Sequence, residues 1–406
     1  MSLSSRKRVR AAAATVAALA VGTTAGAAEV YYQPIVSLSS AYNSNLDLDA
    51  TTAKRSAVGY FADAATSIGI ATPQSDTFLQ PRLQYNYYPT ATDRNRLEGF
   101  LNLNSRYSWQ RDRFNLTGYF DHRDDVNAEQ PSAVTNPVNP GVGETTATTG
   151  QIRVGTTRNY LILDPTFTHL LSPLSSIGLA TEYQRMDYSP SDNAGHADFN
   201  YYQGRLFYAK TIDLRTDFSI GAFGSKYQSG NVGSHSTSGG VQLSGGYNWT
   251  QVLRSDLTVQ WQRTKFEEPQ VFNVTSNPWA ATFTTVYKEQ ISSYRFSVGR
   301  TIYPSSAGGL YTTDQVRGQY DRELTQRLHF TGALRFFSDR TTTGVGGNSV
   351  RNYATGTVRA QYMLSPTFFV AGNYTYVYQK YQVNPNSTDA NMVSISFGYR
   401  GLERQH

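Results

Sequence analysis

The chain has 406 residues, of which 13% are aromatic and only 16% charged, and it contains no cysteine. Its mean hydropathy of -0.46 and the lack of any later apolar run of about twenty residues exclude a helical membrane protein. The missing thiols exclude cysteine catalysis and Cys-ligated metal sites. A charged fraction below the roughly one quarter of soluble proteins, with 29 Tyr and 20 Phe, favours a β-sheet protein that faces lipid.

Residues 1–27 have the features of a cleaved signal peptide. A basic cluster at positions 6–10 precedes a small-residue apolar stretch at 11–21, and Ala25-Gly26-Ala27 has the form of an A-x-A cleavage site. We expect cleavage after Ala27 or Ala28. Four of the 36 basic residues lie in this segment, so the remaining chain has 32 basic against 30 acidic residues. The high pI therefore does not indicate nucleic-acid binding, which needs a clustered basic surface.

The rest of the chain alternates apolar and polar residues, the period of a β-strand with two different faces. From 241 to 249, for example, Val241, Leu243 and Tyr247 share one face, while Gln242 and Ser244 share the other. The pattern predicts about eighteen strands, with sixteen as the alternative because the turn between the two strands at 278–303 has no strong Gly or Pro signal. The expected strands are 32–45, 57–71, 76–89, 96–110, 113–124, 155–170, 175–189, 197–211, 215–228, 236–250, 254–266, 278–288, 290–303, 310–323, 327–340, 349–363, 366–381 and 388–401.

Short and long connections alternate along the chain, as in bacterial transmembrane barrels, where periplasmic turns are short and extracellular loops are long. Residues 72–76, 110–113 and 324–327 are expected short turns. The longest connections, 125–155 and 267–278, are rich in Asn, Pro, Thr and Gly and should be extracellular.

A soluble β-sandwich also alternates, but two features favour the membrane. Many of the predicted strands reach about twelve residues, whereas strands of globular proteins usually have about five or six. Tyr107, Trp109, Tyr247 and Trp249 lie near strand ends, where aromatic residues mark the membrane interfaces. We therefore predict one all-β domain at 28–406: a closed antiparallel barrel in the outer membrane of a Gram-negative bacterium, with a polar, water-filled interior.

No pattern of catalytic residues is present, so an enzyme is not expected. The six His are scattered, and no His-x-x-x-His spacing or Gly-x-Ser-x-Gly motif occurs. Asn43, Asn45, Asp47 and Asp49 alternate at the start of a loop and could bind calcium, but their spacing alone is a weak signal. We expect no cofactor and no bound metal.

Arginines are the most notable residues on the predicted inner face. If the apolar residues point outward, seven arginines point into the barrel, interleaved with Gln and Asn. These candidate contacts for a solute are Arg82, Arg106, Arg205, Arg295, Arg317, Arg335 and Arg359.

Two interpretations of this set remain open. Glu98, Glu182, Asp321 and Glu323 could pair with some of these arginines and stiffen the wall. Alternatively, unpaired arginines could attract an anionic solute into a narrow pore. Amide and Tyr side chains would add hydrogen bonding and stacking on sugar rings.

Short motifs add a resemblance to a known group. Gln33-Pro34-Ile35 is followed by Ala41-Tyr42-Asn43-Ser44-Asn45 and then by Gln80-Pro81-Arg82-Leu83, and a later segment reads Ile302-Tyr303-Pro304-Ser305-Ser306-Ala307-Gly308-Gly309. This order resembles the outer-membrane porins that are encoded with exopolysaccharide systems. The resemblance implies an eighteen-stranded type of barrel that passes a secreted polysaccharide beside periplasmic export components. It carries over no catalytic residue.

Three functions follow from these observations. The first is a non-enzymatic channel for exopolysaccharide export, with lipid and lipopolysaccharide around it and export components in the periplasm. The second is a general or anion-preferring diffusion porin. The third is a structural barrel whose loops, chiefly 125–155, bind a partner at the cell surface.

The inward arginines generate a first prediction. Replacing Arg106 and Arg317 by neutral residues should lower the preference for anions, because each removed charge reduces the attraction that the lumen exerts on them. The measurement is the reversal potential across a planar bilayer under a salt gradient. Unchanged ion selectivity would contradict the assignment of these side chains to the conducting path.

Overall fold

The computed structural model describes residues 28–48, 54–130, 155–189, 196–230, 233–268, 272–342, 351–381, 387–402 and 404–405. The predicted signal peptide lies outside these residues, so its cleavage stays a prediction. Most of the 125–155 connection and residues 269–271 of the other long connection also lie outside the described residues.

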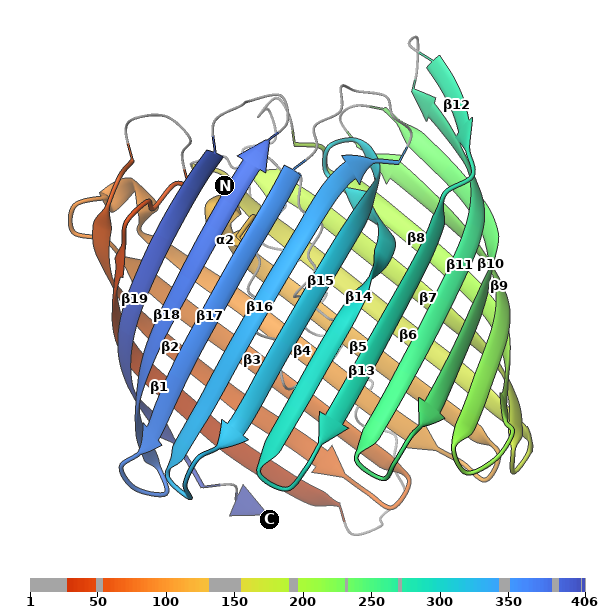
Figure 1. Cartoon of the computed structure of the whole chain (residues 1–406), viewed down its shortest axis with the longest axis horizontal. Helices are drawn as coiled ribbons and strands as arrows, with labels where there is room; N and C mark the ends of the chain where they lie inside the picture. The colour runs from red at the N-terminus through yellow and green to blue at the C-terminus, as the bar shows by residue number, and fades with distance from the viewer. Residues whose placement is uncertain are drawn as a thin grey trace.

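The described chain forms a single closed antiparallel sheet (Figure 1). Each strand pairs with the next along the chain, and β1 pairs with both β2 and β19, which closes the barrel. The wall strands are β1 (Glu29–Asn43), β2 (Ala57–Ala71), β3 (Ser75–Tyr87), β4 (Arg96–Ser108), β5 (Asp112–Asp124), β6 (Thr157–Ser172), β7 (Ser175–Ser189), β8 (Phe199–Thr211), β9 (Thr216–Ser229), β10 (His235–Asn248), β11 (Leu253–Glu268), β13 (Trp279–Lys288), β14 (Ser292–Ser305), β15 (Gly309–Glu323), β16 (Leu328–Thr341), β17 (Arg351–Met363), β18 (Phe368–Tyr381) and β19 (Ser387–Arg400).

Four short elements complete the described structure. Strand β12 (Phe272–Ser276) pairs with the end of β11, and β20 (Arg404–Gln405) pairs with the start of β1. The 3-10 helix η1 (Thr92–Arg94) lies between β3 and β4, and the one-turn helix α2 (Asp125–Ala128) follows β5.

The prediction of eighteen wall strands is confirmed, including the uncertain pair, which the structure forms as β13 and β14. The 267–278 connection differs from the expected loop. Strand β11 continues to Glu268 and pairs with β12, so this connection is largely a hairpin that extends beyond the wall.

The two faces of the wall differ as the alternation predicts. Large apolar side chains are exposed on the outer face, among them Leu38, Leu83, Leu206 and Ile395. Lipid can accept such side chains, whereas water would not favour so many of them. The short turns, the start of β1 and the end of β19 lie at one rim, and the strand ends that the longer connections join lie at the other. No helix in the described part of the chain is long and apolar enough to cross a membrane.

A closed barrel with an apolar outer band is the architecture of Gram-negative outer-membrane proteins, and the chain is assigned to that membrane. Because the short turns of such barrels are periplasmic, the rim with the long connections is the extracellular one.

Two adjacent glycines of β10 differ in how much space the neighbouring strands leave for a side chain. A Cβ at Gly240 would lie 2.2 Å from the carbonyl oxygen of Trp261 on β11, whereas a Cβ at Gly239 would have no neighbour nearer than 3.9 Å. We predict that Gly240→Ala destabilises the barrel by roughly 1–3 kcal/mol, because backbone atoms must move. Urea unfolding followed by tryptophan fluorescence measures the effect, and Gly239→Ala is the matched control. Equal unfolding midpoints for the two variants would contradict the prediction.

Candidate solute pathway

The extracellular end of the β14–β15 hairpin folds into the lumen and contacts strands far from its neighbours in the wall. The Tyr227 hydroxyl on β9 donates to the carbonyl oxygen of Ser305 at 2.9 Å. The Ser234 hydroxyl donates to the carbonyl oxygen of Gly308 at 2.7 Å. In the wall, β10, β11 and β13 separate β9 from β14. The hairpin therefore crosses part of the lumen, and Gly308 permits its turn with a φ of +95°.

Helix α2 enters the lumen from the other side. Its following residue, Glu129, is completely buried and forms an ion pair of 3.2 Å with the buried Arg351 at the start of β17. Strands β4, β3, β2, β1, β19 and β18 separate β5 from β17 along the wall. A segment that leaves β5 and pairs with β17 must therefore span the lumen near its extracellular end.

His196 connects these two inward segments. A nitrogen of its ring lies 3.3 Å from the Asp125 carboxylate of α2, and the ring stacks on Tyr188 with centroids 4.6 Å apart. The Tyr188 hydroxyl donates to the Ser306 hydroxyl at 3.0 Å. We call α2 with Glu129, the residues 196–197 and the hairpin end 305–308 the inner plug.

The start of the inner plug is held to the extracellular loops by charge. The Asp124 carboxylate caps α2 by accepting from the Val126 amide at 2.9 Å, and it also accepts from buried Arg94 at 2.7 Å. Glu98 accepts from Asn127 at 2.7 Å. Because charged groups are costly to bury without partners, this network holds the segment in one place.

Beside the plug, Asp198 supports the connection that carries His196. Its carboxylate accepts from the backbone amide of Tyr188 at 2.8 Å. Burial raises the pKa of Asp198 above its ordinary value, since the charged form loses contact with water. The hydrogen bond from the Tyr188 amide lowers the pKa of Asp198 in turn, because it stabilises the charged form.

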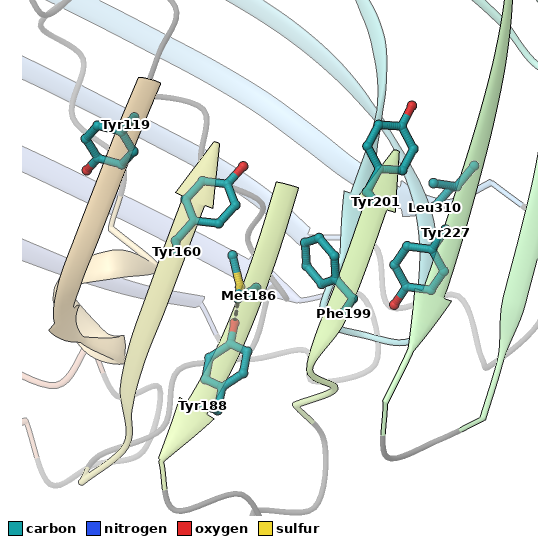
Figure 2. Close-up of a cluster of buried hydrophobic side chains, with 8 residues drawn as sticks. All are labelled: Tyr119, Tyr160, Met186, Tyr188, Phe199, Tyr201, Tyr227 and Leu310. Carbon is teal, nitrogen blue, oxygen red and sulfur yellow. Dashed lines mark hydrogen bonds between the residues drawn. The ribbon is translucent and has the colours of Figure 1, made fainter. Parts of the chain in front are cut away.

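The lumen is less polar than the sequence suggested. A cluster of buried side chains lines its extracellular half on β5–β9, with Leu310 of the hairpin added (Figure 2). The members are Tyr119, Tyr160, Met186, Tyr188, Phe199, Tyr201, Tyr227 and Leu310. These residues have inward phase in their strands. Alternation predicts that these side chains face the lumen. It cannot predict that the β14–β15 hairpin packs over them and shields them from water.

A polar cavity of about 300 Å³ lies next to the hairpin, between two walls of the barrel. Glutamine amides are its most frequent polar groups, from β7, β8, β11 and β15. It also contains Arg335 and Asp339 of β16 and Glu182 of β7. The glutamines are Gln184, Gln203, Gln260, Gln262 and Gln315.

All seven predicted arginines have the inward phase, opposite to the exposed apolar residues of their strands. Arg82 forms an ion pair with Asp63 at 2.6 Å, a partner that the sequence did not indicate. Arg205 and Arg335 lie over the rings of Phe207 and Phe337, each 5.1 Å from the ring centroid.

Four of the seven stand on consecutive strands, from β14 to β17. Arg295 lies on β14, Arg317 on β15, Arg335 on β16 and Arg359 on β17. Arg317 and Arg335 are direct cross-strand partners. Like charges in that position repel each other, so the two arginines make this part of the wall locally basic. We call these four residues the basic strip.

Two carboxylates stand on the wall that faces the basic strip, which also carries the inward Arg106 on β4 and Arg158 on β6. Asp164 on β6 and Glu182 on β7 point inward, and in the described chain neither has a Lys, Arg or His within ion-pair distance. Strand β6 lies opposite β16, because the same number of strands separates them in both directions around the wall.

The four carboxylates expected to neutralise the arginines take other partners in the described structure. Glu98 binds the α2 segment, and Glu182 accepts from Gln184. Asp321 accepts from Gln319 and Thr331, and Glu323 lies 3.9 Å from His329. These contacts were not predicted, because alternation tells which face a residue occupies but not its neighbours on other strands.

The buried arginines of the network were not predicted from the sequence. Arg158 pairs with Asp121 at 2.9 Å, and both are completely buried, as is Arg351 beside Glu129. The same alternation could have found Arg351, because it has the phase of Arg359 on β17. Arg94 lies in a loop, and no periodic signal could have found it.

The side chains that were predicted as possible calcium ligands form hydrogen bonds and an ion pair within the protein instead. The Asn43 side chain accepts from the amide of Asn45, and the Asn45 side chain donates to Thr388 at 2.8 Å. Asp47 lies 3.4 Å from Arg94, and Asp49 is outside the described residues. The described residues contain no group of three or more His, Cys, Asp or Glu that could hold a metal.

Comparisons with known proteins concern the barrel alone. No family model matches the chain, and no curated protein does. Among solved structures, Acinetobacter baumannii OccAB3 is similar, with 9% identity, a TM-score of 0.46 and coverage of 92% of this chain and 99% of that chain. Pseudomonas aeruginosa OccK2 (OpdF) in complex with glucuronate has 8% identity, a TM-score of 0.46 and coverage of 92% and 98%. The P. aeruginosa outer membrane protein opdK has 9% identity, a TM-score of 0.45 and coverage of 91% and 99%.

The Glu129–Arg351 pair should hold the inner plug closed. We predict that Arg351→Gln loosens α2, because removing one partner of a buried ion pair costs about 3–5 kcal/mol. Single-channel recordings should then show a larger mean conductance and more current noise than the wild-type channel. Arg185→Gln is the control, since Arg185 is exposed, pairs with Asp187 and lies outside the solute path. Identical traces from all three proteins would disprove the role of this ion pair.

Proposed function

We propose that the barrel is a passive diffusion channel that prefers small anionic solutes. The observation that carries this proposal is the basic strip on β14–β17, which faces Asp164 and Glu182 across a lumen narrowed by the inner plug. A solute in this path lies within a few ångströms of charged walls, where electrostatic attraction is strong and water screens it incompletely.

Weak contacts suit such a channel, because a solute must leave as readily as it enters. The basic strip supplies charge, and the glutamine-lined cavity supplies both donors and acceptors to hydroxyl groups. Towards the periplasmic rim, Arg400 and His329 line a second cavity of about 720 Å³. A small acid bearing hydroxyl groups could therefore exchange partners along the path. The seven predicted arginines are candidate contacts for it.

Export of an exopolysaccharide was the leading expectation from sequence, and the diffusion channel is now the better supported function. The comparisons give no support to an association with polysaccharide systems. The inner plug also argues against a polymer, because ion pairs and hydrogen bonds hold it across the lumen. A polymer chain would have to displace this network for as long as it was being exported.

A set of three sugars of similar size tests the proposal. In liposome swelling assays, uptake should decrease in the order glucuronate, glucose, glucosamine, because these probes are anionic, neutral and cationic. Arg317→Gln with Arg335→Gln should reduce the ratio of glucuronate to glucose uptake by about five-fold, the effect of about 1 kcal/mol of lost attraction.

Substitutions of the two facing carboxylates provide the matched control. Asp164→Asn with Glu182→Gln should change the same ratio in the opposite direction, because the repulsive charges are removed. Equal uptake of all three sugars would indicate a general pore and contradict the proposed preference. Absence of swelling with a folded barrel would instead favour a structural role.

A further inference from the structure

An apolar groove runs along the outer wall between β11 and β18, away from the solute path. It has a volume of about 820 Å³. Ala281 and Ala354 leave space between much larger neighbours on the outer face. The large apolar residues that line it are Leu257, Trp279, Phe283, Val298, Val316, Phe336 and Tyr378.

Basic side chains lie at this groove. Arg300 and Asp314, which line it, form an ion pair of 2.6 Å, and Arg340 shares the same carboxylate. One carboxylate therefore serves two guanidinium groups, which leaves positive charge in excess. The Arg300 guanidinium also lies 4.4 Å from the centroid of the Trp279 ring. Tryptophan is typical of the membrane interface, where lipid headgroups lie.

A further cation lies on the neighbouring strands. Lys380 of β18 is exposed and is the cross-strand partner of Asn352, which lines the groove. In the described chain Lys380 has no carboxylate within ion-pair distance. Arg340 and Lys380 each precede the last residue of their strand at the extracellular rim. These positive charges therefore lie at the level of the headgroups of the outer leaflet.

We propose that this groove binds a phosphorylated glycolipid of the outer leaflet, of the chemical class of lipid A. An acyl chain lies against Phe283, Val298 and Phe336, and a phosphate contacts Arg300 and Arg340. Guanidinium groups bind phosphate oxygens through paired charge-assisted hydrogen bonds. The phosphate neutralises the excess charge that Asp314 leaves.

A second copy of the chain fits this surface less well. In a twofold-symmetric pair whose axis passes beside Arg300 and Arg340, these basic residues of both copies would lie close together. Such like charges repel, whereas an anionic headgroup is complementary to them. The charge at the groove therefore favours the lipid over a dimer.

Binding of purified lipid A bearing both phosphates tests the proposal. The barrel in neutral detergent is titrated with this lipid and observed by native mass spectrometry, with dephosphorylated lipid A as the comparison ligand. The wild-type barrel should bind one phosphorylated lipid and bind the dephosphorylated form roughly ten-fold more weakly, the scale of one charged hydrogen bond. Arg340→Gln should weaken binding of the phosphorylated form by a similar factor.

Two further variants keep the test clear. Ala281→Phe fills the groove without changing its charge and should also weaken binding. Arg185→Gln removes an exposed arginine that pairs with Asp187 elsewhere on the wall, at 2.8 Å, and should leave binding unchanged. Equal binding of both lipid forms, or equal binding by all variants, would overturn the proposal. A mass of two or more chains that Ala281→Phe abolishes would assign the groove to a second copy and would also overturn it.

Discussion

The structure depends on one constraint: within a membrane, every backbone N–H and C=O group of the wall needs a partner in the sheet. Pairing of β1 with β19 satisfies it by removing both free edges. Closure also gives each strand one face to lipid and one face to the lumen. The alternation of the sequence, the outward Leu and Phe and the inward Arg and Gln all follow from this geometry.

Closure creates a wide lumen that wall side chains alone do not fill, and the chain narrows it with its connections. The β14–β15 hairpin reaches towards β9, and α2 reaches β17 through Glu129 and Arg351. Both use polar contacts that are buried and therefore must be satisfied. The same contacts that close the lumen also place the charged walls near any solute that passes, so the shape of the channel and its selectivity have a common origin.

Charge is distributed unevenly around this path although residues 28–406 contain 32 basic and 30 acidic residues. The basic strip occupies β14–β17, whereas Asp164 and Glu182 occupy the facing strands. Four arginines on neighbouring strands raise the positive potential on that side of the lumen. On the outer wall, Arg300 and Arg340 share one acid, and this local excess of charge lies beside an apolar groove. The inner surface therefore suits small anions and the outer one suits an anionic lipid.

The sequence by itself determined the number of strands, their approximate bounds and the inward phase of all seven arginines, because the side-chain period of two is a local property of each strand. It could not determine that Arg317 stands beside Arg335, that Asp164 faces the basic strip or that Glu129 meets Arg351. Those relations join strands far apart in sequence and depend on the register and closure of the whole sheet. The inner plug was equally hidden, because its segments have no periodicity, and only contacts across the lumen decide where they fold.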